Sequence, residues 1–368
     1  MKDVHAVLRM EEDRVSSSFS LSSFSIRDTR KDTSIHPSYR SVLTFGGTAK
    51  PAIAVILNVA KREDGRHVTA ISACIGSLVV MPTPFIFSAI DTAQCLWTRL
   101  HAELQDAGLS AAPKERQRSL PGSHMVTDSP VTIDVRVENP FFFFLHDVTI
   151  DRSPALLLSF AVDCSLSLAS DGCADSTLNV LGVRVCRGDP SVMTLPEPGD
   201  RDLIRPFDLS ANVHLTDGFK GVRGTVSCSD VLARLGIKDV RLMLDALTAL
   251  VPTSLRSERE STPSWMNEEL FSWNVTVYGS MSSLQVVVVN DAKSNETPVV
   301  AARMEQFFAK VEVYSDAMKV QCDCTLAADS YVPCKTLWEP LLEEWSVSAV
   351  MKREPRERIV GERGESEV

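Results

Sequence analysis

The chain has 368 residues and a net charge of −10, with 44% hydrophobic and 23% charged residues. This composition can form a sizeable core, and the length is typical of two or three domains. The acidic charge argues against a nucleic-acid-binding protein, which would carry a basic stripe. Nine cysteines without repeated spacing argue against a disulfide framework. We find no secretory signal and no apolar run long enough to span a membrane, so we expect a reduced, cytoplasmic protein.

The first part of the chain changes from polar to strand-like sequence. Residues 1–38 are rich in Ser, Asp and Arg, and we expect them to be disordered. Alternating apolar residues predict strands at 53–59 and 71–75. From Thr83 the apolar period changes from two to about 3.6, which predicts a helix that stops near Gly108.

The middle of the chain holds the longest alternating segments. Residues 131–137 and 207–215 alternate apolar with polar side chains. Residues 156–168 do so over a length of about 43 Å at 3.3 Å per residue. This is far longer than the usual strand of about five or six residues. Phe141–Phe144 precede it, and we expect a strand buried on both faces or wedged under a helix. The alternative is a tip that inserts into a membrane.

The order of elements then repeats. Val240, Leu244, Leu247 and Val251 have helical spacing, Pro252 ends that helix, and a polar linker follows to residue 266. Further strands are predicted between 273 and 326. The pattern of strands, helix and linker predicts the following units: a module at 39–128, a module at 129–266, a partial module at 267–350 and a disordered charged tail at 351–368.

No set of residues predicts catalysis or a metal site. The seven histidines do not recur with carboxylates or cysteines at ligand spacing, and no nucleotide-binding or nucleophile motif is present. Cys322 and Cys324 lie two apart on a predicted strand, on the side of Met318, Val320 and Leu326. Free cysteine packs as a small hydrophobe, so a structural role is favoured over zinc. We therefore expect no enzyme activity and no cofactor.

A long strand with one apolar face must bury that face or cover it with a ligand. One solution is a closed β-sandwich of two sheets packed about 10 Å apart. The other is an open, curved sheet whose apolar face holds acyl chains. The alternation alone does not separate the two, and taken by itself it favours the sandwich.

One segment resembles a family signature. Leu337–Trp345 is similar to the WEPLIEPW motif of the chorein family, the vacuolar protein sorting thirteen proteins. Glu344 replaces the usual Pro. The matching residues are Trp338, Glu339, Pro340, Leu341, Leu342, Glu343 and Trp345. Four weaker segments follow the family's order: Asp147–Leu158, Ile204–Leu209, Val240–Leu250 and Leu284–Asp291. The resemblance covers about residues 40–350 and places them in the family's late middle region, before its adaptor-binding domain.

The resemblance implies a mainly β fold of repeating β-groove modules, with long antiparallel strands and short connecting helices. It implies a fragment of a bridge-like lipid transfer protein, cytoplasmic and peripheral at membrane contact sites. Glycerophospholipids would move along its apolar groove between organelle membranes, and adaptor proteins are further expected partners. The alternative is a closed β-sandwich that binds adaptors and holds no lipid. We predict the following groove residues: Leu156, Leu158, Phe160, Val162, Leu209, Val213, Leu215, Met318 and Val320.

Overall fold

The computed structural model describes residues 2–11, 14–27, 35–45, 52–61, 67–81, 130–151, 153–169, 173–188, 199, 202–216, 221–250, 274–291, 296–314 and 317–353. The helix predicted from Thr83 and both predicted linkers lie outside these residues.

Strands make up most of the described chain, which confirms the mainly β prediction. They are β1 (Lys2–Glu11), β2 (Arg14–Arg27), β3 (Ser41–Phe45), β4 (Ile53–Lys61), β5 (His67–Ile75), β6 (Leu78–Val80), β7 (Val131–Val137), β8 (Phe141–Leu145), β9 (Ala155–Leu168), β10 (Ala174–Gly188), β11 (Asp202–Thr216), β12 (Gly221–Cys228), β13 (Val231–Gly236), β14 (Asn274–Asn290), β15 (Thr297–Val313), β16 (Met318–Val332) and β17 (Leu337–Arg353). A short 3-10 helix, η1 (Pro37–Tyr39), and the helix α2 (Ile237–Leu250) accompany them.

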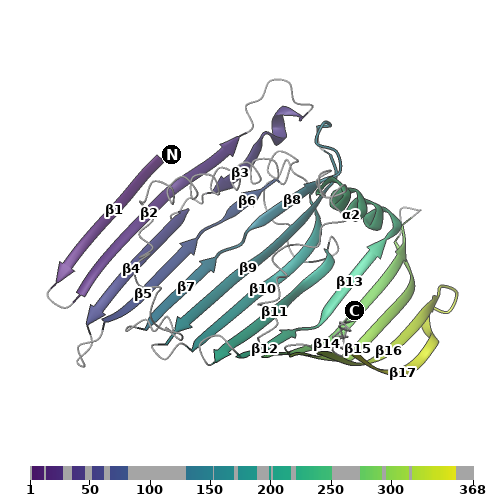
Figure 1. The fold of residues 1–368 in the computed structure, drawn as a ribbon. Coiled ribbons are helices and arrows are strands. Elements are labelled where there is room, and N and C mark those ends of the chain that lie inside the picture. The colour runs from purple at the N-terminus through teal and green to yellow at the C-terminus, as the bar shows by residue number, and fades with distance from the viewer. Residues whose placement is uncertain are drawn as a thin grey trace, which may run out of the picture.

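All 17 strand segments belong to one sheet. Four pairs of consecutive segments lie end to end on the same line, namely β3 with β4, β5 with β6, β7 with β8 and β12 with β13. The segments therefore fill 13 positions across a long band, in chain order (Figure 1). Because the described strands form one sheet and not two stacked sheets, the β-sandwich alternative is wrong for this part of the chain.

The pairing is antiparallel except at two junctions. β5 and β6 pair in parallel with β7 and β8, and β12 and β13 pair in parallel with β14. A parallel pair needs a long crossover connection, and these two follow the connections at 81–130 and 237–273. Three antiparallel runs result: β1–β6, β7–β13 and β14–β17. The division of the chain into modules at 128 and 266 stays a prediction.

The first 38 residues correct one expectation. We predicted disorder for residues 1–38, but β1 and β2 lie there and fill the first two positions of the sheet. β2 pairs with β1 on one side and with β4 on the other, so strands distant in sequence order this Ser-rich segment. At the other end, β17 continues to Arg353, into the tail predicted from residue 351.

The helix predicted at Val240–Val251 is confirmed as α2 (Ile237–Leu250). The aromatic run forms β8, which is buried on one face and partly buried on the other, so the prediction of burial on both faces is confirmed for one face only. Phe143 is buried with Tyr39, Met81 and Leu157 in a small core that η1 helps to cover. On the opposite face, Phe142 stacks on Phe144 and on Phe160.

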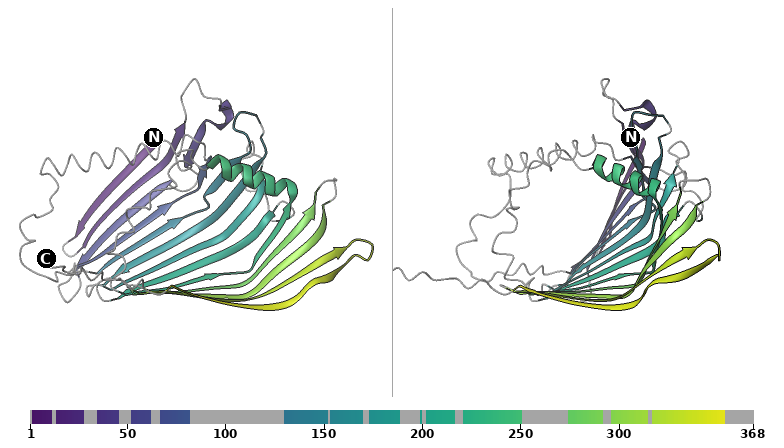
Figure 2. Two further views of the ribbon diagram at one scale, coloured as in Figure 1. Left: turned by 45° about the vertical axis from the view of Figure 1, so that its right-hand side comes forward. Right: turned by 90° about the vertical axis from the view of Figure 1, so that its right-hand side faces the viewer.

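Two of the long strands, β10 and β15, each have a backbone irregularity part-way along their length. β10 bulges between Leu181 and Arg184, where Gly182 takes a left-handed φ of 60° and donates its N–H to Asp208 at 2.7 Å. β15 shifts register between Glu305 and Phe308. Bulges bend strands and increase their twist, and the sheet is visibly curved and twisted in Figure 2.

Candidate functional site: one apolar face of the sheet

The strand register sorts the side chains of the sheet by face. Residues that pair directly across neighbouring strands point to the same face, and alternate residues along a strand point to opposite faces. Two adjacent rows can be followed through all 13 positions. The first row is Leu8, Ser17, Leu57, Ile71, Ile133, Leu166, Ser176, Val213, Gly224, Val277, Val311, Val320 and Met351.

The second row on this face contains no polar residue other than cysteine. It is Ala6, Phe19, Val55, Ala73, Val135, Cys164, Leu178, Ala211, Val226, Gly279, Ala309, Cys322 and Ala349. The rows cross both parallel junctions without a break. We call this side the apolar face. At about 4.8 Å per position it is about 60 Å long.

The row between these two lies on the other side of the sheet and is mostly polar. It is Val7, Ser18, Ile56, Ser72, Asp134, Ser165, Thr177, Asn212, Thr225, Tyr278, Lys310, Gln321 and Val350. We call this side the polar face. The sheet is therefore two-sided over the middle of its length, while Val7, Ile56 and Val350 are apolar residues near its two ends.

All nine predicted groove residues lie on the apolar face by register. For example, Val180 of β10 pairs with Val162 of β9 on one side and with Leu209 of β11 on the other. Leu156 differs from the rest because it is buried in a small core with Leu203. The other eight are only partly buried. Whether this face binds lipid stays a prediction.

Several cysteines lie on the apolar face. Cys322 and Cys324 lie on the apolar face opposite Ala349 and Val347 of β17, as their spacing predicted. Cys228 pairs with Leu209 on the same face. Burial raises the pKa of the Cys228 thiol, and the nearby Asp230 carboxylate raises it further. Among the described residues, no group of three or more His, Cys, Asp or Glu side chains could hold a metal ion.

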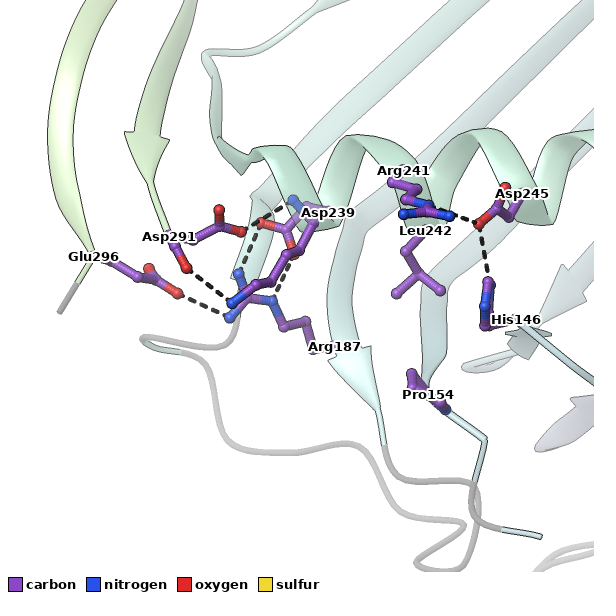
Figure 3. A pocket seen from close by; sticks show the side chains of 10 residues that line it. His146, Pro154, Arg187, Asp239, Arg241, Leu242, Asp245, Asp291 and Glu296 are labelled. Carbon is purple, nitrogen blue, oxygen red and sulfur yellow. Dashed lines mark hydrogen bonds and ion pairs between the residues drawn. The ribbon is translucent and has the colours of Figure 1, made fainter. Parts of the chain in front are cut away.

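Helix α2 lies across one end of the strands, on the apolar face. Its Leu242 and Met243 pack on the core formed by Leu156 and Leu203. It is held there by a charged cluster that we call the α2 latch: Arg187, Lys238, Asp239, Asp291 and Glu296. Figure 3 shows Arg187, Asp239, Asp291 and Glu296 gathered at the first turn of the helix.

The α2 latch joins elements from both sides of a parallel junction. Arg187 of β10 donates to both oxygens of Asp239 at 2.6 and 2.8 Å and to Glu296 at 2.9 Å. The hydrogen bond to Asp239 is the main cause that raises the pKa of Arg187. Asp239 also accepts from the Gly236 N–H, as a residue at the third position of a helix can do. A Cβ at Gly236 would collide with the Asp291 carboxylate, so a larger residue there would displace that carboxylate from the cluster.

Lys238 makes the remaining contacts of the α2 latch. Its backbone N–H donates to Asp291 Oδ2 at 3.0 Å, and its Nζ donates to the Asp291 carbonyl at 2.8 Å. Further along α2, His146 lies 3.2 Å from Asp245. Together these groups line a cavity of about 690 Å³ between the helix and the strand ends. The sequence did not reveal this cluster, because its members come from four segments that are far apart in the chain.

The residues of the predicted family motif lie at the start of β17. Trp338 packs edge-on against Tyr331 with ring centroids 5.3 Å apart, on the polar side. Leu342 and Trp345 pair with Ala328 and Leu326, on the apolar face. Leu341 and Trp345 are strongly exposed. Glu339 accepts from Lys335 at 2.6 Å, while Pro340 and Glu343 lie within the strand.

A comparison with known proteins bears on this arrangement. Over 307 residues the chain is 19% identical to the intermembrane lipid transfer protein vps13A of Dictyostelium discoideum. The chain is distantly similar to a VPS13 lipid transfer protein. The match covers 71% of this chain and 9% of that protein, so the chain spans a small part of its relative's length. No protein-family model matches the chain.

The match supports the resemblance read from the Trp338–Trp345 segment, while the position of the chain within the family stays a prediction. No helix among the described residues is long and apolar enough to cross a membrane.

Proposed function

We propose that this chain is part of a bridge-like lipid transfer protein, and that glycerophospholipids move along its apolar face between organelle membranes at contact sites. The observation that supports this most is the continuity of the two rows across all 13 positions, both parallel junctions included, with Ser17 and Ser176 as the two hydroxyl side chains among them. If the apolar residues only packed each module internally, polar residues could interrupt the rows at each junction. A path along which acyl chains slide has to stay apolar from one module to the next.

The proposed mechanism involves no covalent chemistry. A lipid that leaves a bilayer loses about 0.8 kcal/mol for each CH₂ group exposed to water. The apolar face restores this contribution, which lowers the barrier to extraction. Strands of 14–17 residues, as in β9 and β14, are about 45–55 Å long, which exceeds an extended acyl chain. The polar headgroup stays toward water.

Native mass spectrometry of the full chain, purified from cells under mild conditions, tests this proposal. We expect one or more phospholipid molecules bound to each chain. The same preparation should speed transfer of fluorescent phosphatidylethanolamine between phosphatidylcholine vesicles. A folded chain that carries no lipid and leaves vesicle transfer at the uncatalysed rate would contradict the proposal.

Native thiols offer a second test that needs no substitution. Cys164 and Cys322 lie on the apolar face, Cys74 lies on the polar face opposite Arg136, and Cys334 is exposed in a turn. Bound acyl chains should slow the reaction of Cys164 and Cys322 with a water-soluble maleimide. Cys74 and Cys334 should react at the same rate with and without lipid, as mapped by peptide mass spectrometry. Equal protection of Cys74 would mean that lipid does not choose a face.

A further inference from the structure

A second pocket, of about 300 Å³, lies on the polar face, away from the proposed lipid path. Leu235 packs in the core on the apolar face, so its neighbour Arg234 points to the polar face, where it pairs with Val287 of β14. We call this site the Trp338 pocket. Its lining includes Arg205, Leu232, Arg234, Val287, Pro298 and Trp338, from β11, β13, β14, β15 and β17.

One wall of the Trp338 pocket is a tryptophan that the structure holds in place but leaves accessible. Trp338 packs edge-on against Tyr331 of β16, with ring centroids 5.3 Å apart, and remains 40% exposed. The register of β16 and β17 shifts between Leu326 and Asp329. Such irregularities bend a sheet, and the curvature is seen in Figure 2. The indole ring and Pro298 offer a ligand a fixed apolar surface.

The Trp338 pocket also presents two accessible guanidinium groups. Arg205 is exposed, and the Arg234 side chain is 42% exposed. Arg234 lies 3.3 Å from Glu296, but that carboxylate also accepts from Arg187 at 2.9 Å. One carboxylate is therefore shared between two arginines, which leaves Arg234 able to bind a further anion together with Arg205.

The carboxylate in the pocket lining, on Asp202, is already occupied. It accepts from the buried Arg184 at 2.6 Å and from the Gly199 N–H at 3.1 Å. Its charge is balanced by Arg184, so it does not neutralise the two guanidinium groups. The pocket is therefore positive, in a chain whose net charge is −10.

These features fit a carboxylate that stands next to an apolar side chain. Guanidinium groups bind carboxylates through charge-assisted hydrogen bonds, and the indole ring with Leu232 and Val287 can cover an apolar group. Trp and Arg are also the residues that most often dominate the energy of protein–protein binding. We infer that the Trp338 pocket docks a partner protein, through a segment in which an acidic residue stands beside an apolar one. This goes beyond the proposed function, because the pocket lies on the face opposite the lipid path.

Selection of phage-displayed random peptides on the immobilised full chain tests this inference. We expect the enriched peptides to carry aspartate or glutamate next to a large apolar residue. The most enriched peptide is then labelled with fluorescein, and its affinity for the wild-type chain and for variants is measured by fluorescence anisotropy.

The test variants are Arg205→Glu and Trp338→Ala. Loss of a charged hydrogen bond or of a central tryptophan contact should weaken binding about thirtyfold. Arg205 is exposed, so its variant should fold even if Trp338→Ala disturbs the packing on Tyr331. The matched controls are Arg223→Glu and Tyr278→Ala, an exposed arginine and a 37% exposed aromatic residue elsewhere on the polar face. We expect both controls to bind within about twofold of wild type.

A selection that enriches no acidic sequence, or a peptide that binds Arg205→Glu as tightly as the wild-type chain, would overturn the inference. Equal losses in Arg205→Glu and Arg223→Glu would also overturn it, because binding would then follow overall charge and not the pocket. Lipid content and vesicle transfer should stay at the wild-type level in all four variants. A chain that binds the peptide but carries no lipid would contradict the proposed function and still support the Trp338 pocket.

Discussion

Replacing both Val162 and Val213 by lysine is expected to abolish lipid binding and leave the sheet folded. Both side chains lie on the apolar face, Val162 opposite Val180 and Val213 opposite Ser176. A lysine in the hydrocarbon centre of a bilayer costs about 3 kcal/mol. Two of them against bound acyl chains should lower lipid affinity on the order of ten-thousandfold, since about 1.4 kcal/mol is a factor of ten.

The sheet should tolerate this change because both positions are only partly buried. Lysine can extend its ammonium group into water along the open face. Lipid content is measured by native mass spectrometry, transfer by the vesicle assay, and folding by circular dichroism and urea unfolding.

The matched control puts the same charges on the same strands but on the polar face, as Ser165→Lys with Asn212→Lys. Ser165 pairs with Asp134 and Thr177, so a lysine there has polar neighbours. We expect wild-type lipid content and transfer. Two results would argue against an open lipid path. One is unfolding of the Val162 and Val213 variant alone, which would indicate a sealed core. The other is an equal loss of lipid in both variants.

The sequence predicted the faces of the sheet better than its extent. The alternation at 131–137, 156–168 and 207–215 is strong because each apolar residue contributes to the same face, and these segments are β7, β9 and β11. β10 was missed. Its bulge at Gly182 shifts the alternation by one residue, which hides the period of two.

β2 was missed for a different reason. Ser16, Ser18 and Ser20 fill its polar face, and Ser17 lies among Val15, Phe19 and Leu21 on the other. Its own apolar content is low, and its order comes from pairing with β1 and β4. Non-local pairing of this kind leaves little trace in a short window of sequence.

For helix α2 the sequence pattern predicted the element correctly but not the side that faces the sheet. Helical spacing located α2, but the sheet contacts Leu242 and Met243 and leaves Val240 and Leu244 outward. The first turn of the helix is tied to the sheet by the α2 latch, whose carboxylates come from residues that are 52 and 109 positions away from Arg187. An apolar pattern reports which residues avoid water, not whether protein or ligand covers them.

The latch leads to the second prediction, which concerns stability. Arg187→Met should free α2 from the sheet, because it removes the partner of a buried carboxylate. The Asp239 side chain is 3% exposed. Breaking a buried pair from one side costs about 3–5 kcal/mol. Arg187 is itself 40% exposed, so solvent screening reduces this to about 2 kcal/mol.

Hydrogen exchange of the α2 amides measures this directly, because it reports local opening as well as global unfolding. A loss of about 2 kcal/mol should speed exchange about thirtyfold. The matched control is Arg241→Met on the same helix, whose nearest carboxylate, on Asp245, is 4.0 Å away and which is mostly exposed. Such a surface pair contributes little, and we expect exchange within about twofold of wild type.

A second substitution separates charge from shape. Asp239→Asn keeps an oxygen for the Gly236 N–H but removes the unpaired charge. In the Arg187→Met background it should restore most of the protection, since no buried charge then remains without a partner. If the double variant exchanges as fast as Arg187→Met alone, the latch acts through packing of the arginine stem. If Arg187→Met exchanges no faster than Arg241→Met, the latch does not hold the helix, and the packing of Leu242 and Met243 is sufficient.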